Sequence, residues 1–376
     1  MTGKKERLTL DDKVKMFCME SMPILPPETI AGAAEYIKAI AKELMNVDSQ
    51  EERYVSLEYR VSKPLPHIDE FRAQKDHLGH PLTTGRAEVL IFNMLFLELL
   101  SDLALFQDKQ REQTFVYFLS KYARLLAAPR DPDTARFYNW LYSSFADNPD
   151  YDYHIHFVKA GIASVFVLMH EWSHKQRDII DLMKKLLFSS DKFTDVMQKI
   201  EQKVREEYPD CSEDQIQHKM EELTEEIACD VSALSMSSEY GFEQHFNCSK
   251  TEMVGYSMLS LSAAAALDYL SAIRINMNPE NEKALLNGFS KVLIERIQPL
   301  AVAIKLACNS NLFFGSCDVH EALRLSQESI SWLLEKGGKY YNDELTKKIT
   351  EYNSMADQER DTFTFVCEPY EWGIFA

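Results

Sequence analysis

The chain has 376 residues, which is enough for one large domain or two modest ones, and 45% of them are hydrophobic, so a sizeable core is available. Only 12 residues are glycine, whereas good helix formers are abundant, so we expect mostly helix. The net charge of −18 argues against non-specific binding to nucleic acids or anionic membranes, because both require a basic surface.

The seven cysteines are scattered along the chain and include no C-x-x-C pair. A disulfide framework or a structural zinc ribbon would show paired spacing, so we interpret the cysteines as reduced thiols of a cytoplasmic protein. The first residues contain no apolar stretch of the secretory type. The apolar runs at 89–100 and 160–169 are shorter than the roughly 20 residues that span a bilayer, so we expect no membrane association.

Hydrophobic periodicity predicts the elements in chain order. One strand is predicted at 53–61, where tyrosine, valine and leucine alternate with polar residues, and the segment 148–157 is compatible with a strand or a loop. Helices are predicted at 11–46 (interrupted near Pro23–Pro27), 83–106, 113–126, 135–145, 157–180, 189–208, 212–238, 251–275, 280–308, 318–335 and 339–353. We expect an N-terminal region (1–150), a catalytic core (151–280) and a C-terminal helical region (281–376). No clear linker separates them, so the alternative is that all three form a single domain.

The run His170-Glu171-Trp172-Ser173-His174 lies near the polar end of the predicted helix 157–180. Residues four apart lie on one face of a helix, so His170 and His174 can present two imidazole nitrogens to one metal ion. Glu171 lies beside the first histidine and can act as the general base for a water molecule. The motif therefore predicts a catalytic zinc site with one ion per chain.

A catalytic zinc ion usually has three protein ligands, and no further histidine follows His174 at a suitable spacing. The predicted helix 212–238 contains Glu226 and Asp230, which are four residues apart and so share one face. Glu226 is our candidate for the third ligand. Asp230 is our candidate for the acceptor of a hydrogen bond from the other ring nitrogen of one histidine. The alternative is that this acidic segment is only a solvated helix face.

Together, His170-Glu171-x-x-His174 and Glu226-x-x-x-Asp230 resemble the two motifs of the gluzincin metallopeptidases. The resemblance covers only the two helices. It implies that Glu226 is the third zinc ligand and that Asp230 lies behind the ligands. A residue that stabilises the oxyanion is not identified by the sequence, and His245, Tyr256, Tyr269 and Arg274 are all open candidates.

We therefore expect a mainly α fold, namely a helical metallopeptidase core with a small β-sheet beside the His-Glu-x-x-His helix. The edge of that sheet would hold an extended substrate. The favoured function is a cytoplasmic zinc metalloprotease that acts on a protein or peptide, restrained by a regulatory partner or trigger. The alternatives are a metal-dependent hydrolase of a non-peptide bond and a helical interaction protein with a degenerate metal site.

Overall fold

The computed structural model describes residues 52–58, 65, 67–71, 87–109, 113–145, 157–239, 247–275, 279–309 and 317–364. The chain divides into two compact units, one formed by Met1–Leu99 with Glu368–Ala376 and the other by Leu100–Cys367. The predicted helix at 11–46 and most of the segment 148–157 lie outside the described residues. Within the described part of the chain, no helix has the length and apolar character needed to cross a membrane.

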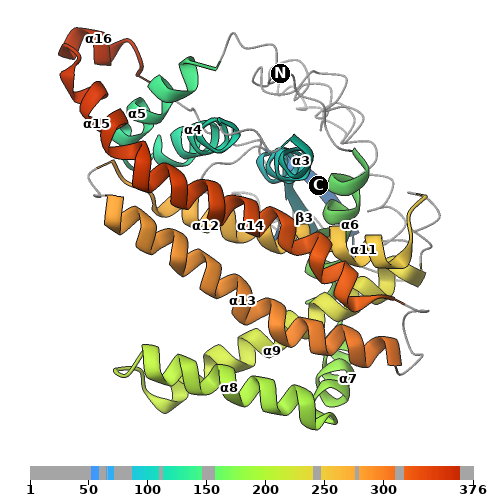
Figure 1. The fold of residues 1–376 in the computed structure, drawn as a ribbon. Coiled ribbons are helices and arrows are strands. Elements are labelled where there is room, and N and C mark those ends of the chain that lie inside the picture. The colour runs from blue at the N-terminus through green and yellow to red at the C-terminus, as the bar shows by residue number, and fades with distance from the viewer. Residues whose placement is uncertain are drawn as a thin grey trace, which may run out of the picture. The chain divides into compact units, whose positions relative to one another are not determined.

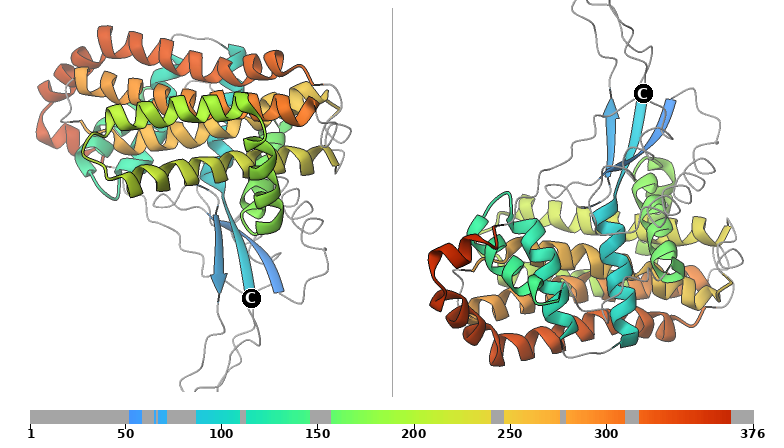
Figure 2. Two further views of the ribbon diagram at one scale, coloured as in Figure 1. Left: turned by 90° about the horizontal axis from the view of Figure 1, so that it is seen from below. Right: turned by 90° about the horizontal axis from the view of Figure 1, so that it is seen from above.

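The N-terminal unit contains a three-stranded sheet of β1 (Glu52–Glu58), β2 (His67–Phe71) and β3 (Ala87–Asn93). The strand order is β1-β3-β2, with β3 parallel to β1 and antiparallel to β2 (Figure 2). The helix predicted over 83–106 is therefore wrong in its first half. The segment Ala87–Asn93 contains valine, isoleucine and phenylalanine, which favour strands, and it pairs on both of its edges.

The helix α3 (Met94–Lys109) follows β3 directly and begins at a side-chain cap, because the backbone N–H of Leu95 donates to Asn93 Oδ1 at 2.9 Å. The second unit continues with these helices: α4 (Thr114–Ala127), α5 (Pro132–Ser143), α6 (Phe157–Ser173), α7 (Arg177–Phe188), α8 (Asp191–Glu207), α9 (Glu213–Glu239), α11 (Lys250–Ser257), α12 (Leu259–Ala272), α13 (Pro279–Asn309), α14 (Val319–Asp343), α15 (Leu345–Ser354) and α16 (Asp357–Asp361).

The helix α6 is covered by other helices of its unit. Its residues from Ala160 to Met169 are all buried, and it packs against α9, α11 and α12. A helix that is apolar on all sides is stable only when other elements cover it, so the sequence of α6 requires this position. The long helices α13 and α14 run side by side (Figure 1).

The mainly α class is supported, but the small β-sheet predicted beside the His-Glu-x-x-His helix is wrong. Among the described residues from Leu100 to Cys367 there is no strand, and α6 packs against the helices α9, α11 and α12. The three strands belong to the other unit. The physical reason is the uniform burial of α6, whose apolar surface is covered by other helices of its own unit.

Candidate metal centre

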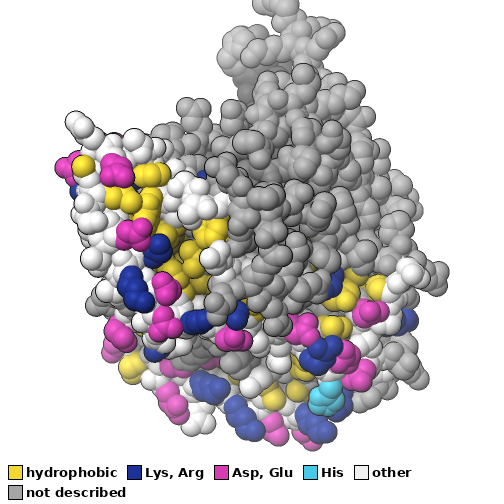
Figure 3. Space-filling view, turned by 45° about the horizontal axis from the view of Figure 1, so that its top comes forward, with side chains coloured by type: hydrophobic (Ala, Val, Ile, Leu, Met, Phe, Trp, Pro, Cys, Tyr) yellow, Lys and Arg dark blue, Asp and Glu magenta, His cyan; other side chains and the backbone are white. Residues whose placement is uncertain are grey.

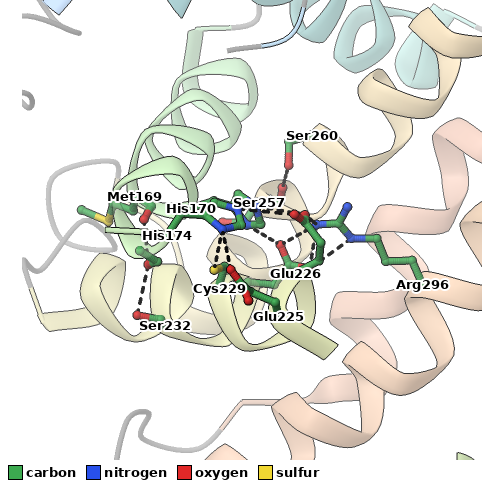
Figure 4. A network of polar contacts seen from close by, with 12 residues as sticks. Met169, His170, His174, Glu225, Glu226, Cys229, Ser232, Ser257, Ser260 and Arg296 are labelled. Atoms are coloured by element: carbon green, nitrogen blue, oxygen red, sulfur yellow. Dashed lines mark hydrogen bonds and ion pairs between the residues drawn. The ribbon is translucent and has the colours of Figure 1, made fainter. Parts of the chain in front are cut away.

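Two packed helices position the candidate ligands. His170 lies in the last turn of α6, and His174 is the first residue after that helix, which ends at Ser173. The predicted helix over 157–180 is thus divided into α6 and α7. Ser173 Oγ lies 3.1 Å from Ser232 Oγ of α9, and this buried contact fixes the end of α6 on its neighbour (Figure 4).

The helix α9 carries the acidic candidates. It begins at a reciprocal cap, because Gln215 N–H donates to Ser212 Oγ and Ser212 N–H donates to Gln215 Oε1. Further along α9, Glu226 and Asp230 lie on the face that is turned toward α6. Their spacing of one helical turn brings both carboxylates against His170.

His170, His174 and Glu226 have ligand atoms that lie within 4.8 Å of one another. The two Nε2 atoms of His170 and His174 are 3.2 Å apart. The Glu226 carboxylate reaches both, with Oε2 3.3 Å from Nε2 of His170 and Oε1 3.4 Å from Nε2 of His174. Figure 4 shows these three side chains pointing toward one another.

The distances among these atoms fit a tetrahedral zinc site. With zinc–nitrogen and zinc–oxygen bonds of about 2.0–2.1 Å, two ligand atoms at the tetrahedral angle are separated by about 3.3–3.4 Å. The observed separations of 3.2, 3.3 and 3.4 Å agree with this value. Two imidazoles and one carboxylate are also a ligand set that catalytic zinc sites use, so the residues fit the ion that the sequence predicts.

Asp230 lies behind His170. Its side chain is fully buried, and Oδ1 is 2.8 Å from His170 Nδ1. The ring N–H is not well aligned with this oxygen, so the contact is an ion pair without a linear hydrogen bond. Asp230 nevertheless sets the ring orientation, since it attracts a proton to Nδ1 and leaves Nε2 on the side of His174 and Glu226.

Arg296 of α13 joins both carboxylates of α9. Its Nη2 atom donates to Glu226 Oε2 at 3.0 Å and lies 3.2 Å from Asp230 Oδ1, and its Nε atom is 3.3 Å from Asp230 Oδ2. A buried carboxylate without a partner is costly, so this guanidinium is what makes a fully buried Asp230 tolerable. It also limits the rotation of Glu226.

The other ring nitrogen of His174 has two neighbours. Cys229 Sγ lies 3.4 Å from Nδ1, and Glu225 Oε1 lies 3.7 Å from it. Glu225 is itself held by Lys184 of α7 at 2.9 Å, so it is drawn away from the three candidate ligands. Burial and the surrounding acids raise the pKa of Cys229 well above the usual range, so its thiol stays protonated.

Glu171 is partly exposed, and no hydrogen bond or ion pair links it to another described residue. Burial of the carboxylate raises its pKa to about 7, although the neighbouring His170 opposes the rise. A carboxyl group with a pKa close to neutrality can both accept and donate a proton, which is what a general base that later acts as an acid requires.

The charges of the cluster shift the other pKa values. Burial would lower the pKa of His170, but contacts with Asp230 and Glu226 outweigh it and raise the pKa to about 9. Burial would raise the pKa of Glu226, but His170 and Arg296 lower it to about 2. Burial and the charge of His170 lower the pKa of His174. Glu226 is therefore a carboxylate, as a metal ligand must be.

Sequence reasoning did not identify Arg296 or Cys229. Arg296 is 70 residues beyond Glu226, and no local pattern marks it. The earlier candidate Arg274 instead donates to the carbonyl groups of Ser271 and Ile273. The only sequence signal for Cys229 is its position between Glu226 and Asp230 on the predicted helix 212–238. His245 lies outside the described residues.

Comparisons with known proteins do not place the chain in a family. No family model matches it, and neither a curated protein nor a solved structure is similar to it.

Proposed function

We propose that this chain is a cytoplasmic zinc-dependent protease that cleaves peptide bonds in a protein or peptide substrate. His170, His174 and Glu226 hold one zinc ion per chain. The observation that carries this proposal is the triangle of their ligand atoms, whose edges of 3.2, 3.3 and 3.4 Å fit a tetrahedral site. Glu171, beside the first ligand, supplies the proton-transfer group.

When bound, zinc would polarise the scissile carbonyl group and lower the pKa of a water molecule. Glu171 takes the proton of the attacking water on its carboxylate and returns it to the leaving amine. Asp230 fixes the ring of His170, and Arg296 holds Asp230 and Glu226 in place through the contacts described above. Mobility of these side chains would lower the rate, because catalytic groups act only in a narrow range of geometry.

The test separates metal binding from catalysis through Glu171→Gln. This substitution keeps the size of the side chain and removes the basic carboxylate. We expect the variant to keep its zinc, measured by elemental analysis, and its melting temperature. Hydrolysis of a quenched fluorescent peptide library, sensitive to a chelator in the wild type, should fall by about 10²–10⁴-fold.

Glu222→Gln is the matched control, because Glu222 lies on α9 with a side chain that is 62% exposed and forms an ion pair with His218, away from the candidate ligands in sequence. It should leave both zinc content and hydrolysis unchanged. The proposal is wrong if carefully purified wild-type protein neither contains nor takes up zinc. It is also wrong if Glu171→Gln is as active as the wild type. Zinc loss in Glu171→Gln would make Glu171 a ligand and would overturn the assigned roles.

A further inference from the structure

A cavity of about 480 Å³ is lined by residues of α4, α5, α14 and α15 and of the turn that follows α5. This volume lies within the range of about 300–1,000 Å³ that is typical of sites for small molecules. None of the lining residues belongs to α6, α9 or α13, which carry the metal centre and its supporting arginine. The cavity is therefore a separate feature and does not depend on the proposed protease activity.

Part of the lining is aromatic and aliphatic. Phe115 and Val116 lie in the first turn of α4, Leu141 lies in the last turn of α5, and Phe145 follows α5. The rings of Phe115 and Tyr340 pack with their centroids 5.8 Å apart, so α4 and α14 together fix this wall. Tyr340 is 3% exposed, and its hydroxyl group has no hydrogen-bond partner among the described residues. Buried polar groups are normally paired, so Tyr340 brings an unused hydrogen-bonding group to the lining.

The charged part of the lining is basic. Lys336 and Lys339 of α14 and Lys348 of α15 contribute to it, against one acid, Glu344. Three lysines and one glutamate give an excess of two positive charges, whereas the whole chain has a net charge of −18. Basic, acidic and hydrophobic side chains are mixed on the face that Figure 3 shows, so an excess of one sign in the lining is local. Such an excess attracts an anion.

Two of these lysines form ion pairs with exposed acids that do not line the cavity. Lys336 Nζ lies 3.0 Å from Oε1 of Glu335, whose side chain is 73% exposed. Lys348 Nζ lies 2.9 Å from Oε2 of Glu351, whose side chain is 53% exposed, and 5.5 Å from the centre of the Trp140 ring. Ion pairs with exposed acids contribute little free energy, so an anion in the cavity can compete with them for the lysines.

The N-terminus of α4 adds a second favourable interaction for an anion. Gln113 is the N-cap residue of this helix and lines the cavity, and its side chain accepts no hydrogen bond from the first turn. The positive end of a 14-residue helix therefore borders the cavity. Helix N-termini stabilise nearby anions through the aligned peptide dipoles and the backbone N–H groups of the first turn.

We propose that this cavity binds a small organic anion. Its apolar or aromatic body packs against Phe115, Leu141 and Phe145, and its acidic group, a carboxylate or a phosphate, lies beside the lysines. Both parts of the lining are needed for this assignment. The lysines disfavour a neutral apolar molecule, and the aromatic wall provides no polar partner for a small inorganic ion.

The test titrates the full chain with two fluorescent dyes that share one ring system. Anilinonaphthalene sulfonate is an aromatic anion, and N-phenylnaphthylamine lacks the sulfonate. We expect the anionic dye to bind with a dissociation constant on the order of 10 μM. The neutral dye should bind at least about 10-fold more weakly, since it cannot pair with the lysines. Raising the salt concentration from about 0.05 M to about 0.5 M should weaken the binding of the anionic dye alone.

Three variants test whether the dye binds in this cavity. Lys348→Gln should weaken binding of the anionic dye by about 3–10-fold and leave binding of the neutral dye unchanged. Lys347→Gln is the matched control, because Lys347 is the preceding residue, has a side chain that is 73% exposed and does not line the cavity. Glu344→Gln should tighten binding of the anionic dye, because it removes the negative charge of the lining.

Melting temperatures check that the variants are folded, and the comparison of the two dyes on the wild type does not depend on the variants. The proposal is overturned if the two dyes bind equally tightly, which would indicate a purely apolar site. It is also overturned if Lys347→Gln weakens binding as much as Lys348→Gln does, or if the wild type does not bind the anionic dye.

Discussion

Glu282 is a buried acid whose ionisation should control part of the stability. It lies in the first turn of α13, is only 2% exposed, and its Oε2 atom has no hydrogen-bond partner among the described residues. Tyr138 of α5 and Tyr340 of α14 are close enough to experience its charge. Burial raises the pKa of Glu282 from 4.5 to about 7, although Arg274 opposes the rise.

The size of the effect follows from the difference between folded and unfolded pKa values. Below pH 4.5 the carboxyl group is protonated in both states, so Glu282 does not disfavour folding. As the pH rises to about 7, the unfolded chain releases the proton while the folded protein keeps it, and the free energy of unfolding falls. At about 1.4 kcal/mol per pKa unit, the full cost is about 3.5 kcal/mol, of which about 2.5 kcal/mol develops between pH 5 and 8.

The measurement is urea unfolding of the wild type, Glu282→Gln and Glu280→Gln at pH 5 and pH 8. Glu280 is the matched control, because it is exposed in the same helical turn. From pH 5 to pH 8, the free energy of unfolding of the wild type and of Glu280→Gln should each fall by about 2.5 kcal/mol more than that of Glu282→Gln. The buried amide of Glu282→Gln alters the free energy of unfolding equally at both pH values, so it does not affect the difference between pH 5 and pH 8. If Glu282→Gln shows the same change with pH as the wild type, burial of this acid does not raise its pKa as argued.

Five further substitutions test the metal centre and the packing. Glu226→Gln should weaken zinc binding, measured in a competition titration, by more than the roughly 10–100-fold typical of losing a residue that contacts a metal ligand but not the metal. Lys184 holds the carboxylate of Glu225 away from the site, so Glu225→Gln should hardly change zinc binding. An equal effect of the two would contradict the assignment of the ligand face. Asp230→Asn should weaken zinc binding by about 10–100-fold, and a wild-type affinity would mean that His170 needs no partner. Gly255→Ala should destabilise the fold by about 1–3 kcal/mol in urea unfolding, because the added Cβ would lie 2.8 Å from Leu325 Cβ and 3.0 Å from the carbonyl oxygen of Ala322. Gly338→Ala meets no atom within 4 Å and should stabilise α14 by about 0.5–1 kcal/mol, so a loss of stability there would contradict the argument.

The helical elements were largely predictable, since their apolar periodicity is local. The predicted helices 113–126 and 212–238 correspond closely to α4 and α9. The helix predicted over 83–106 was wrong where β3 pairs with two other strands, because the pairing that stabilises a strand involves residues distant in the sequence. The break after His174 was also missed, because residues 157–180 contain no proline and glycine only at Gly161.

Local spacing was sufficient to predict that Glu226 and Asp230 share a face of α9, because they are four residues apart and one turn takes about 3.6 residues. The same spacing predicted a shared face for His170 and His174, although α6 ends at Ser173. The meeting of these two faces, and the contact of Arg296 from α13 with both carboxylates, follow only from the tertiary structure. Such contacts join helices far apart along the chain, so they depend on how buried surfaces such as that of α6 pack together and not on any local pattern.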